Sequence, residues 1–208
     1  MNYTYKIYQN DIPDAGAYSH SLAIDCEMMG LNINRDRLCV IQIYDAVRNQ
    51  VDIIQCKDPA YDAPILKTLL NRPNTVFLGH MIRLDLAYLY KHLGVMPQNV
   101  YCTRTASRIG QTYGASHNYL DLVSNILGKK IDKSETSSYW GAEELTDKQI
   151  KYVCQDVIHL HALKEKLDAI ISHENRQDLA DKAMTMIPDR AYFDAIGWWN
   201  EDILSYPF

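Results

Sequence analysis

The sequence offers little that would place it in a membrane. Its N-terminus, MNYTYKIYQNDIPDAG, has neither a basic start nor an apolar run. No later stretch approaches the roughly 20 apolar residues that a membrane-spanning helix needs. We therefore expect no membrane partner and a cytoplasmic location.

Cysteine and positive charge are also scarce. The 5 cysteines are odd in number, form no C-x-x-C pair and lie mostly in apolar stretches. Buried, reduced thiols are therefore expected rather than disulfides or a zinc site. The formal net charge of -5 argues against the broad basic surface with which proteins hold long nucleic acid. A nucleic-acid substrate would be short, or held at one local site.

Internal repeats and low-complexity linkers are absent too. The chain has 208 residues, of which 47% are hydrophobic and 23% charged, as in an ordinary globular protein. This length suits one domain with a substantial core. We expect a single domain over residues 1–208, with 173–208 as a C-terminal aromatic tail used in packing or oligomerisation.

The stretch LAIDCEMMGL, Leu22 to Leu31, organises the interpretation of the remaining sequence. Its first three residues are typical of a buried strand, and Asp25 and Glu27 follow. Residues two apart on an extended chain point to the same face. Two carboxylates side by side at an apolar edge resist ionisation unless a cation lies between them. An isolated Asp-x-Glu often arises by chance, so a metal site needs further ligands from elsewhere.

The hydrophobic pattern predicts an α/β domain. Strands are expected at residues 22–27, 38–44, 51–55, 75–80 and 99–102. The first three would form an antiparallel meander after a polar N-terminal arm. Helices are expected from about Pro64 to Asn71, before Gly94 and before Gly128. This order implies a mixed β-sheet flanked by α-helices.

A long helix capped at Thr146 or Asp147 is predicted next. Apolar residues recur there at steps of three and four as far as Ile170, so the helix should lie against the sheet. The aromatic residues of the tail, Trp198 and Trp199 among them, are too numerous to leave in water. The tail therefore either closes the core or is buried in another subunit.

Two further carboxylates fall where a metal site would need them. Asp85 lies in the first turn of the helix after the strand at 75–80. Asp156 lies within the long helix, one turn after Tyr152, and such a pair projects from one helical face. Individually, Asp85 is also explained as an acid at a helix N-terminus, and Tyr152 as a packing residue.

Together, Asp25, Glu27, Asp85, Tyr152 and Asp156 resemble, in order and spacing, the DEDD exonuclease superfamily, in its tyrosine-bearing branch with ribonuclease D. The resemblance covers nearly the whole chain and is strongest to the short bacterial nano-RNase C family. NRDRLCVIQI, HLGVMPQNVYCTRTASR and YVCQDVIHLHALK are among the segments that carry it. It implies a ribonuclease H-like fold.

Three departures from that family's pattern are present. Cys26 stands where Thr is common, and Tyr139 precedes Trp140 where an acidic residue is common. The segment MIRLD at 81–85 replaces the more usual Phe-Gly-Arg-Phe-Asp. None of these changes removes a metal ligand.

The resemblance implies phosphodiester hydrolysis with two divalent cations, Mg²⁺ or Mn²⁺, which oxygen-only ligands with room for water select over zinc. It implies that Asp25 bridges both ions, while Glu27 and Asp156 complete the site that holds the attacking water. Asp85 would serve the second ion. Tyr152 would orient the water through its hydroxyl, since its reference pKa near 10 makes it a weak base.

Substrate contacts are implied for the EMMGL stretch, which is similar to oligoribonuclease as well. In oligoribonuclease the residue after the Glu contacts the terminal 3'-OH, and the Leu wedges between the last two bases. These two residues correspond here to Met28 and Leu31. Met29 is a further candidate, although Met29 and Leu31 fit the protein core equally well. His80 and Arg83, beside the third carboxylate, are candidates for base or phosphate contact. A His that ends a strand is more often a hydrogen-bonded structural residue.

We therefore expect a 3'-5' exoribonuclease that degrades short single-stranded RNA, down to dinucleotides, to nucleoside 5'-monophosphates. One alternative is a broader 3'-5' exonuclease that trims structured RNA or single-stranded DNA ends. Another is an inactive nucleic-acid-binding module, against which the clustered acids weigh. The resemblance also implies a homo-oligomeric ring, with an octamer as one form.

Overall fold

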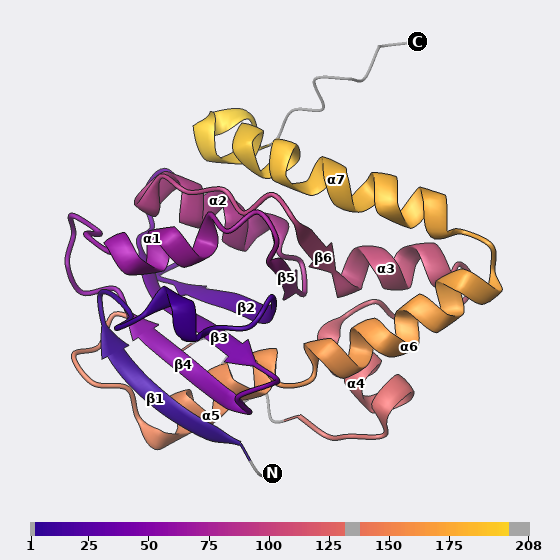
Figure 1. Cartoon of the computed structure of the whole chain (residues 1–208), viewed down its shortest axis with the longest axis horizontal. Helices are drawn as coiled ribbons and strands as arrows, with labels where there is room; N and C mark the ends of the chain where they lie inside the picture. The colour runs from indigo at the N-terminus through magenta and orange to yellow at the C-terminus, as the bar shows by residue number, and fades with distance from the viewer. Residues whose placement is uncertain (1–2, 132–137, 200–208) are drawn as a thin grey trace.

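The computed structural model describes residues 3–131 and 138–199. At its centre lies a mixed six-stranded sheet with strand order β1-β4-β3-β2-β5-β6 (Figure 1). The strands are β1 (Thr4–Gln9), β2 (Ser21–Met28), β3 (Leu38–Asp45), β4 (Gln50–Gln55), β5 (Val76–Gly79) and β6 (Val100–Cys102). The pairs β2/β3 and β3/β4 are antiparallel, while β5 pairs in parallel with both β2 and β6. The predicted meander and mixed ribonuclease H-like sheet are thus confirmed.

The N-terminal arm is itself a strand, which the sequence did not indicate. β1 (Thr4–Gln9) pairs in parallel with β4 at the edge of the sheet. Five of its six residues are exposed. A strand that buries so little side-chain surface shows no apolar pattern, so the expectation of a merely polar arm was wrong.

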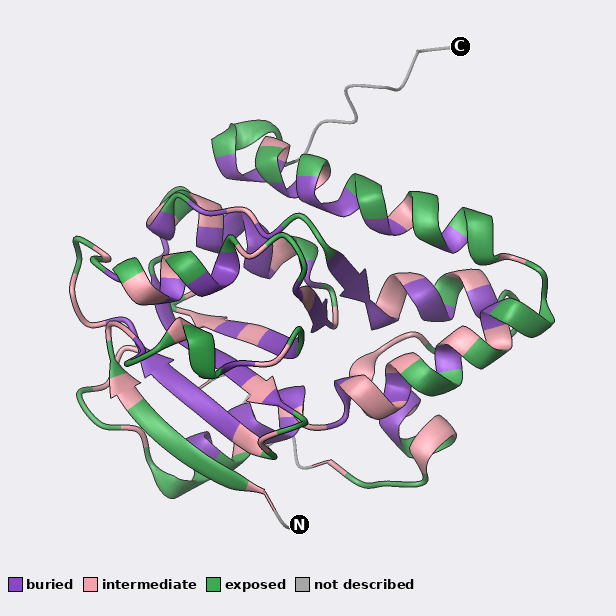
Figure 2. Ribbon diagram, in the orientation of Figure 1, coloured by how far each residue is buried: buried purple, intermediate pink, exposed green. Residues whose placement is uncertain are grey.

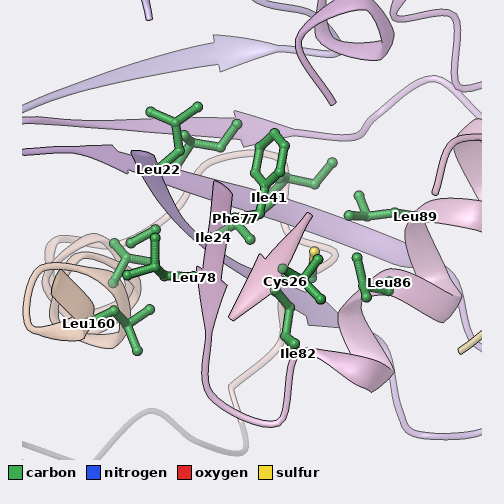
Figure 3. Close-up of a cluster of buried hydrophobic side chains, with 14 of the residues drawn as sticks. Leu22, Ile24, Cys26, Ile41, Phe77, Leu78, Ile82, Leu86, Leu89 and Leu160 are labelled. Carbon is green, nitrogen blue, oxygen red and sulfur yellow. The ribbon is translucent and has the colours of Figure 1, made fainter. Parts of the chain in front are cut away.

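Helices cover both faces of the sheet. α1 (Pro64–Leu70) and α2 (Arg83–Leu93) follow β4 and β5, whereas α5 (Asp147–Val157) packs on β2, β3 and β4 (Figure 1). In Figure 3, Cys26 of β2 points toward Ile82 and Leu86 at the start of α2. Successive strand residues alternate between faces, so Asp25 and Glu27 point to the opposite side.

Buried apolar side chains fill the space between sheet and helices. Figure 2 shows the central strands and the inward sides of the helices as buried. Figure 3 shows the cluster in which Leu22, Ile24 and Phe77 lie within the sheet, and Leu160 approaches Leu78. All five cysteines are buried, as predicted, with free thiols.

The predicted long helix is two helices. α5 ends at Val157, and α6 (Leu160–His173) begins three residues later. Both Val157 and Leu160 are fully buried, so the apolar spacing continues across the break and hides it. α6 packs mainly against α3 (Thr103–Gly110) and α4 (Tyr119–Leu127). The expectation that the whole predicted helix lies against the sheet holds for α5 but is wrong for most of α6.

Much of the stretch expected to be a tail is helical. α7 (Gln177–Phe193) lies across α2 and α3 and continues into a π-helical turn, η2 (Asp194–Trp198) (Figure 1). One side of α7 is buried and the other is exposed (Figure 2). Pro188 lies inside α7, and its presence obscured this helix in the sequence.

Within the described residues, no helix is both long enough and apolar enough to cross a membrane.

Candidate active site

Three of the predicted carboxylates meet where β2 lies against α5. Asp25 and Glu27 are two residues apart near the end of β2, and Asp156 belongs to the last turn of α5. One oxygen atom from each carboxylate lies within 4.8 Å of the other two. We call these three residues the acid cluster. Residues about 130 positions apart in the sequence thus form one compact set of oxygen donors.

Asp85 lies beside the acid cluster but is not one of its three members. It is buried in the first turn of α2, as the sequence predicts. Its Oδ1 accepts a hydrogen bond from the backbone N–H of Cys26 at 3.2 Å. This bond fixes the carboxylate against the strand segment between Asp25 and Glu27.

The electrostatics of these carboxylates favour protonation or a bound cation. Burial raises the pKa of Asp25 to about 7, against a weaker lowering effect of the Cys26 N–H. Burial, followed by the charges of Asp25, Asp156 and Asp85, raises the pKa of Glu27 strongly. Burial also raises the pKa of Asp85, with Asp25 adding to the effect. Negative charge at this site therefore needs a positive partner.

Gln42 is a site residue that the sequence analysis missed. It is fully buried in β3 directly opposite Asp25, and its Nε2 donates to Asp25 Oδ2 at 2.6 Å. Its Oε1 is buried and has no hydrogen-bond partner within the described residues. A lone Gln in the apolar strand LCVIQIY was the available signal, since a buried amide needs polar partners.

Tyr152 lies one helical turn before Asp156 and packs against a buried aromatic residue. Its ring centroid is 5.7 Å from that of Trp140. A second tyrosine, Tyr119 of α4, donates its hydroxyl to the carbonyl of Gln155 at 2.8 Å. Burial, then the charges of Asp156 and Asp25, raises the pKa of Tyr119. Tyr119 therefore lies beside the acid cluster, although nothing in the sequence distinguished it from a packing residue.

The loop after β2 presents two of the predicted substrate-contact residues to solvent. Met29 is 40% exposed and Leu31 is 73% exposed, so the alternative that they belong to the core is wrong. Met28 is partly buried and packs against the core. The loop is held in place because Tyr88 donates its hydroxyl to the Gly30 carbonyl at 3.0 Å.

The other two candidates make contacts within the protein. His80 Nδ1 lies 3.0 Å from Thr103 Oγ1, in keeping with a hydrogen-bonded residue at a strand end. Arg83 Nε pairs with the buried carboxylate of Asp194 at 2.8 Å, and Arg190 also contacts that carboxylate, at 3.3 Å. Arg83 thus ties α2 to η2. Its contact with substrate stays a prediction.

The donors of the acid cluster fit a hard divalent cation. All are carboxylate oxygens, which suit Mg²⁺ or Mn²⁺ rather than softer metals. Burial and, for Glu27, the neighbouring carboxylates raise the pKa values of Asp25 and Glu27, so a bound cation would stabilise the ionised form of the cluster.

Metal binding should release protons and tighten as pH rises. Because the pKa of Asp25 is about 7, a cation must displace protons from the cluster near pH 6. Affinity for Mn²⁺ should therefore rise between pH 6 and 8, by at most about tenfold per pH unit for each proton released. Calorimetry in two buffers of different ionisation enthalpy measures both quantities. Binding that is independent of pH and releases no protons would contradict the electrostatics described above.

In the metal-free protein, by contrast, the stability of the folded state should fall as pH rises. A carboxyl group whose folded pKa exceeds its unfolded value stabilises the folded state fully below the unfolded pKa. That contribution is lost as pH rises through the folded pKa, near 7 for Asp25.

The fold and the acid cluster define a class of nucleases. The sequence matches the family model described as 3'-5' exonuclease over residues 7–172. The chain therefore belongs to the 3'-5' exonuclease family.

Similarity to individual proteins is also extensive. Over 172 residues the chain is 28% identical to ribonuclease D of Gluconacetobacter diazotrophicus, covering 83% of this chain and 43% of that protein. It is 36% identical over 147 residues to DNA polymerase I of Aquifex aeolicus, covering 70% of this chain and 23% of the polymerase. The chain thus spans less than half the length of either relative.

Solved structures of another protein match nearly end to end. NrnC of Brucella melitensis bound to pGG is 36% identical and has a TM-score of 0.93, with 99% of this chain and 100% of that chain covered. A structure of the same protein with bound Mg²⁺ has a TM-score of 0.90 and 35% identity, with 98% and 100% covered.

Proposed function

We propose that the protein is a metal-dependent 3'-5' exoribonuclease that hydrolyses short single-stranded RNA, down to dinucleotides, to nucleoside 5'-monophosphates. The observation that carries this proposal is the acid cluster, whose oxygens lie within 4.8 Å of one another in a chain of the 3'-5' exonuclease family. NrnC, similar over its full length, binds pGG, a 5'-phosphorylated dinucleotide, and supports the choice of a short substrate.

Asp25, Glu27 and Asp156 would hold divalent cations, and Asp85 would serve a second ion from its fixed position beside Cys26. When bound, such ions lower the pKa of water and stabilise charge on phosphoryl and leaving oxygens. The Mg²⁺-bound NrnC structure supports Mg²⁺ as one suitable ion, with Mn²⁺ as the other. Gln42 keeps Asp25 in place through its amide hydrogen bond at 2.6 Å.

The chain's own residues would then position the reactants. We assign to the Tyr152 hydroxyl the orientation of the attacking water. The water oxygen forms a bond to phosphorus, the bond to the 3'-oxygen breaks, and that oxygen takes up a proton as the nucleotide leaves. Met28 would contact the terminal 3'-OH, and the exposed Leu31 would lie against the terminal bases.

The direct test uses 5'-labelled RNAs of two to twenty nucleotides with Mg²⁺ or Mn²⁺. Initial rates should be highest for the shortest RNAs, and stepwise shortening from the 3' end should be seen. Equal rates at all lengths would favour a broader exonuclease. Binding without hydrolysis in either metal would favour the inactive binding module.

A single-stranded DNA series belongs in the same experiment. The similarity to DNA polymerase I of Aquifex aeolicus is the observation that favours DNA ends as an alternative substrate. Faster hydrolysis of DNA than of RNA at matched lengths would replace the ribonuclease proposal with that alternative.

A cytoplasmic location goes with this proposal. All five thiols are free and buried, which suits a reducing compartment.

We also propose a homo-oligomer, built through the exposed side of α7 and η2. Large apolar side chains there are each 40 to 60% exposed. They are Leu179, Met186, Tyr192, Ile196, Trp198 and Trp199, which we call the C-terminal patch. So many exposed apolar residues on α7, η2 and the residue after it favour a protein partner, and a second copy of the chain is the partner proposed. A closed ring, such as an octamer, would restrict access to the active site, so that short or single-stranded RNA ends would enter most easily.

Light scattering on the purified protein tests the oligomer. Replacing Met186 and Trp198 by Gln should weaken self-association by about 10²-fold, since buried aromatic residues dominate such interfaces. Tyr113→Gln is the matched control, because that side chain is 98% exposed outside the patch. Truncation at Pro188 is a poorer test, because it would remove the buried Ala191 from α7. A monomeric wild-type protein that still prefers dinucleotides would eliminate the ring and its role in length selection.

A further inference from the structure

We propose that Tyr139 holds a nucleobase of the substrate beside the acid cluster and thereby sets the affinity for short RNA. This inference rests on the proposed function and adds a residue that selects the substrate. Tyr139 belongs to the segment that enters α5, and its side chain is 64% exposed.

The backbone around Tyr139 is held firmly although the side chain lies in solvent. The Tyr139 carbonyl accepts a hydrogen bond from Gln149 Nε2 at 3.1 Å, and the same amide donates to Ser138 Oγ at 2.9 Å. The next residue, Trp140, is buried and packs against Tyr152. Little backbone conformational entropy would therefore be lost when the Tyr139 ring contacts a ligand.

Three side chains from different parts of the chain converge around Gly141. A Cβ at Gly141 would lie 2.7 Å from Arg37 Nη2, 2.9 Å from Met29 Sδ and 3.3 Å from Tyr139 Cζ. Arg37 Nη2 also donates to the Gly141 carbonyl at 3.3 Å. We call Met29, Arg37 and Tyr139 the Tyr139 ledge. The lack of a side chain at Gly141 is what allows these three groups to meet.

Two of the three ledge residues are close in sequence to residues of the proposed active site. Met29 follows Glu27 by two residues, and Tyr139 precedes Trp140, which contacts the proposed water-orienting Tyr152. Met29 also lies on the same loop as the exposed Leu31. We infer that a nucleotide whose phosphate reached the acid cluster would place a base against these side chains.

The chemistry of the ledge suits a flat heteroaromatic ring. An exposed aromatic ring, a polarisable thioether and a planar guanidinium all pack favourably against nucleobases. A dinucleotide offers few phosphates, and the chain has a formal net charge of -5. Base contacts would therefore add to the affinity that the phosphate gains at the acid cluster.

Steady-state hydrolysis of an RNA dinucleotide by the wild type, Tyr139→Ala and Tyr139→Phe tests the inference. Tyr139→Ala should raise KM about tenfold with kcat within about twofold, because one stacking contact is lost. Tyr139→Phe keeps the ring and should resemble the wild type. Thermal unfolding of both variants should match the wild type, since the side chain is exposed.

Dinucleotides that lack one base or the other show whether the contact is with a base. For one of these two abasic substrates, the difference between the wild type and Tyr139→Ala should disappear. An unchanged KM in Tyr139→Ala, a loss confined to kcat, or a difference that persists with both abasic substrates would overturn the inference. An inactive wild type would instead refute the proposed function, so the two failures are distinguishable.

Discussion

Asp25→Asn should abolish hydrolysis, with a loss of at least about 10³-fold, and leave the fold intact or more stable to heat. Asp25 supplies an oxygen to the acid cluster, and losing its charge removes several kcal/mol of stabilisation from a site that must bind divalent cations. Asn has the same shape, and its carbonyl can still accept the hydrogen bond that Gln42 donates. In the metal-free protein, the variant also removes repulsion among the clustered acids.

Initial rates on an RNA dinucleotide with Mn²⁺, together with thermal unfolding in EDTA, measure both effects. Asp156→Asn should behave in the same way, because it contributes to the same cluster. Glu165→Gln is the control, since Glu165 is an exposed acid on α6. Turnover near the wild-type rate in either Asp variant would show that the metal assignment is wrong.

Tyr152→Phe should lower kcat by about 10²-fold and leave KM nearly unchanged. Only the hydroxyl is removed, and the magnitude is that of a group positioned for proton transfer or water orientation. The ring would remain against Trp140, whose centroid lies 5.7 Å away, so packing in this part of the site is retained.

Kinetics with Tyr113→Phe provide the comparison, because that hydroxyl is removed from a side chain that is 98% exposed. Single-turnover rates separate the chemical step from product release. If Tyr152→Phe keeps the wild-type kcat, Tyr152 is a packing residue and another group must orient the water.

Local patterns were sufficient to predict much of the fold. The strands from Leu22 onward are apolar runs bounded by turn residues, and the stop signals at Gly94 and Gly128 match the left-handed ends of α2 and α4. Both features depend on neighbours in sequence, so they can be recognised without tertiary structure.

Other elements could not be recognised locally. β1 has little buried surface and depends on hydrogen bonds with β4, which follows it by about forty residues in the chain. The break between α5 and α6 interrupts the backbone but not the apolar spacing. α7 contains Pro188, and its packing on α2 and α3 offsets the local cost of that residue.

By itself, the sequence determined which residue types are available and which face of each element they occupy. The spacing of Asp25 and Glu27, and of Tyr152 and Asp156, follows directly from strand and helix periodicity. Only the tertiary structure decided that Asp25, Glu27 and Asp156 come within 4.8 Å, that Gln42 supports Asp25, and that Arg83 pairs with Asp194. The reason is physical: each of these contacts joins elements distant in sequence, and packing of the whole core sets their separation.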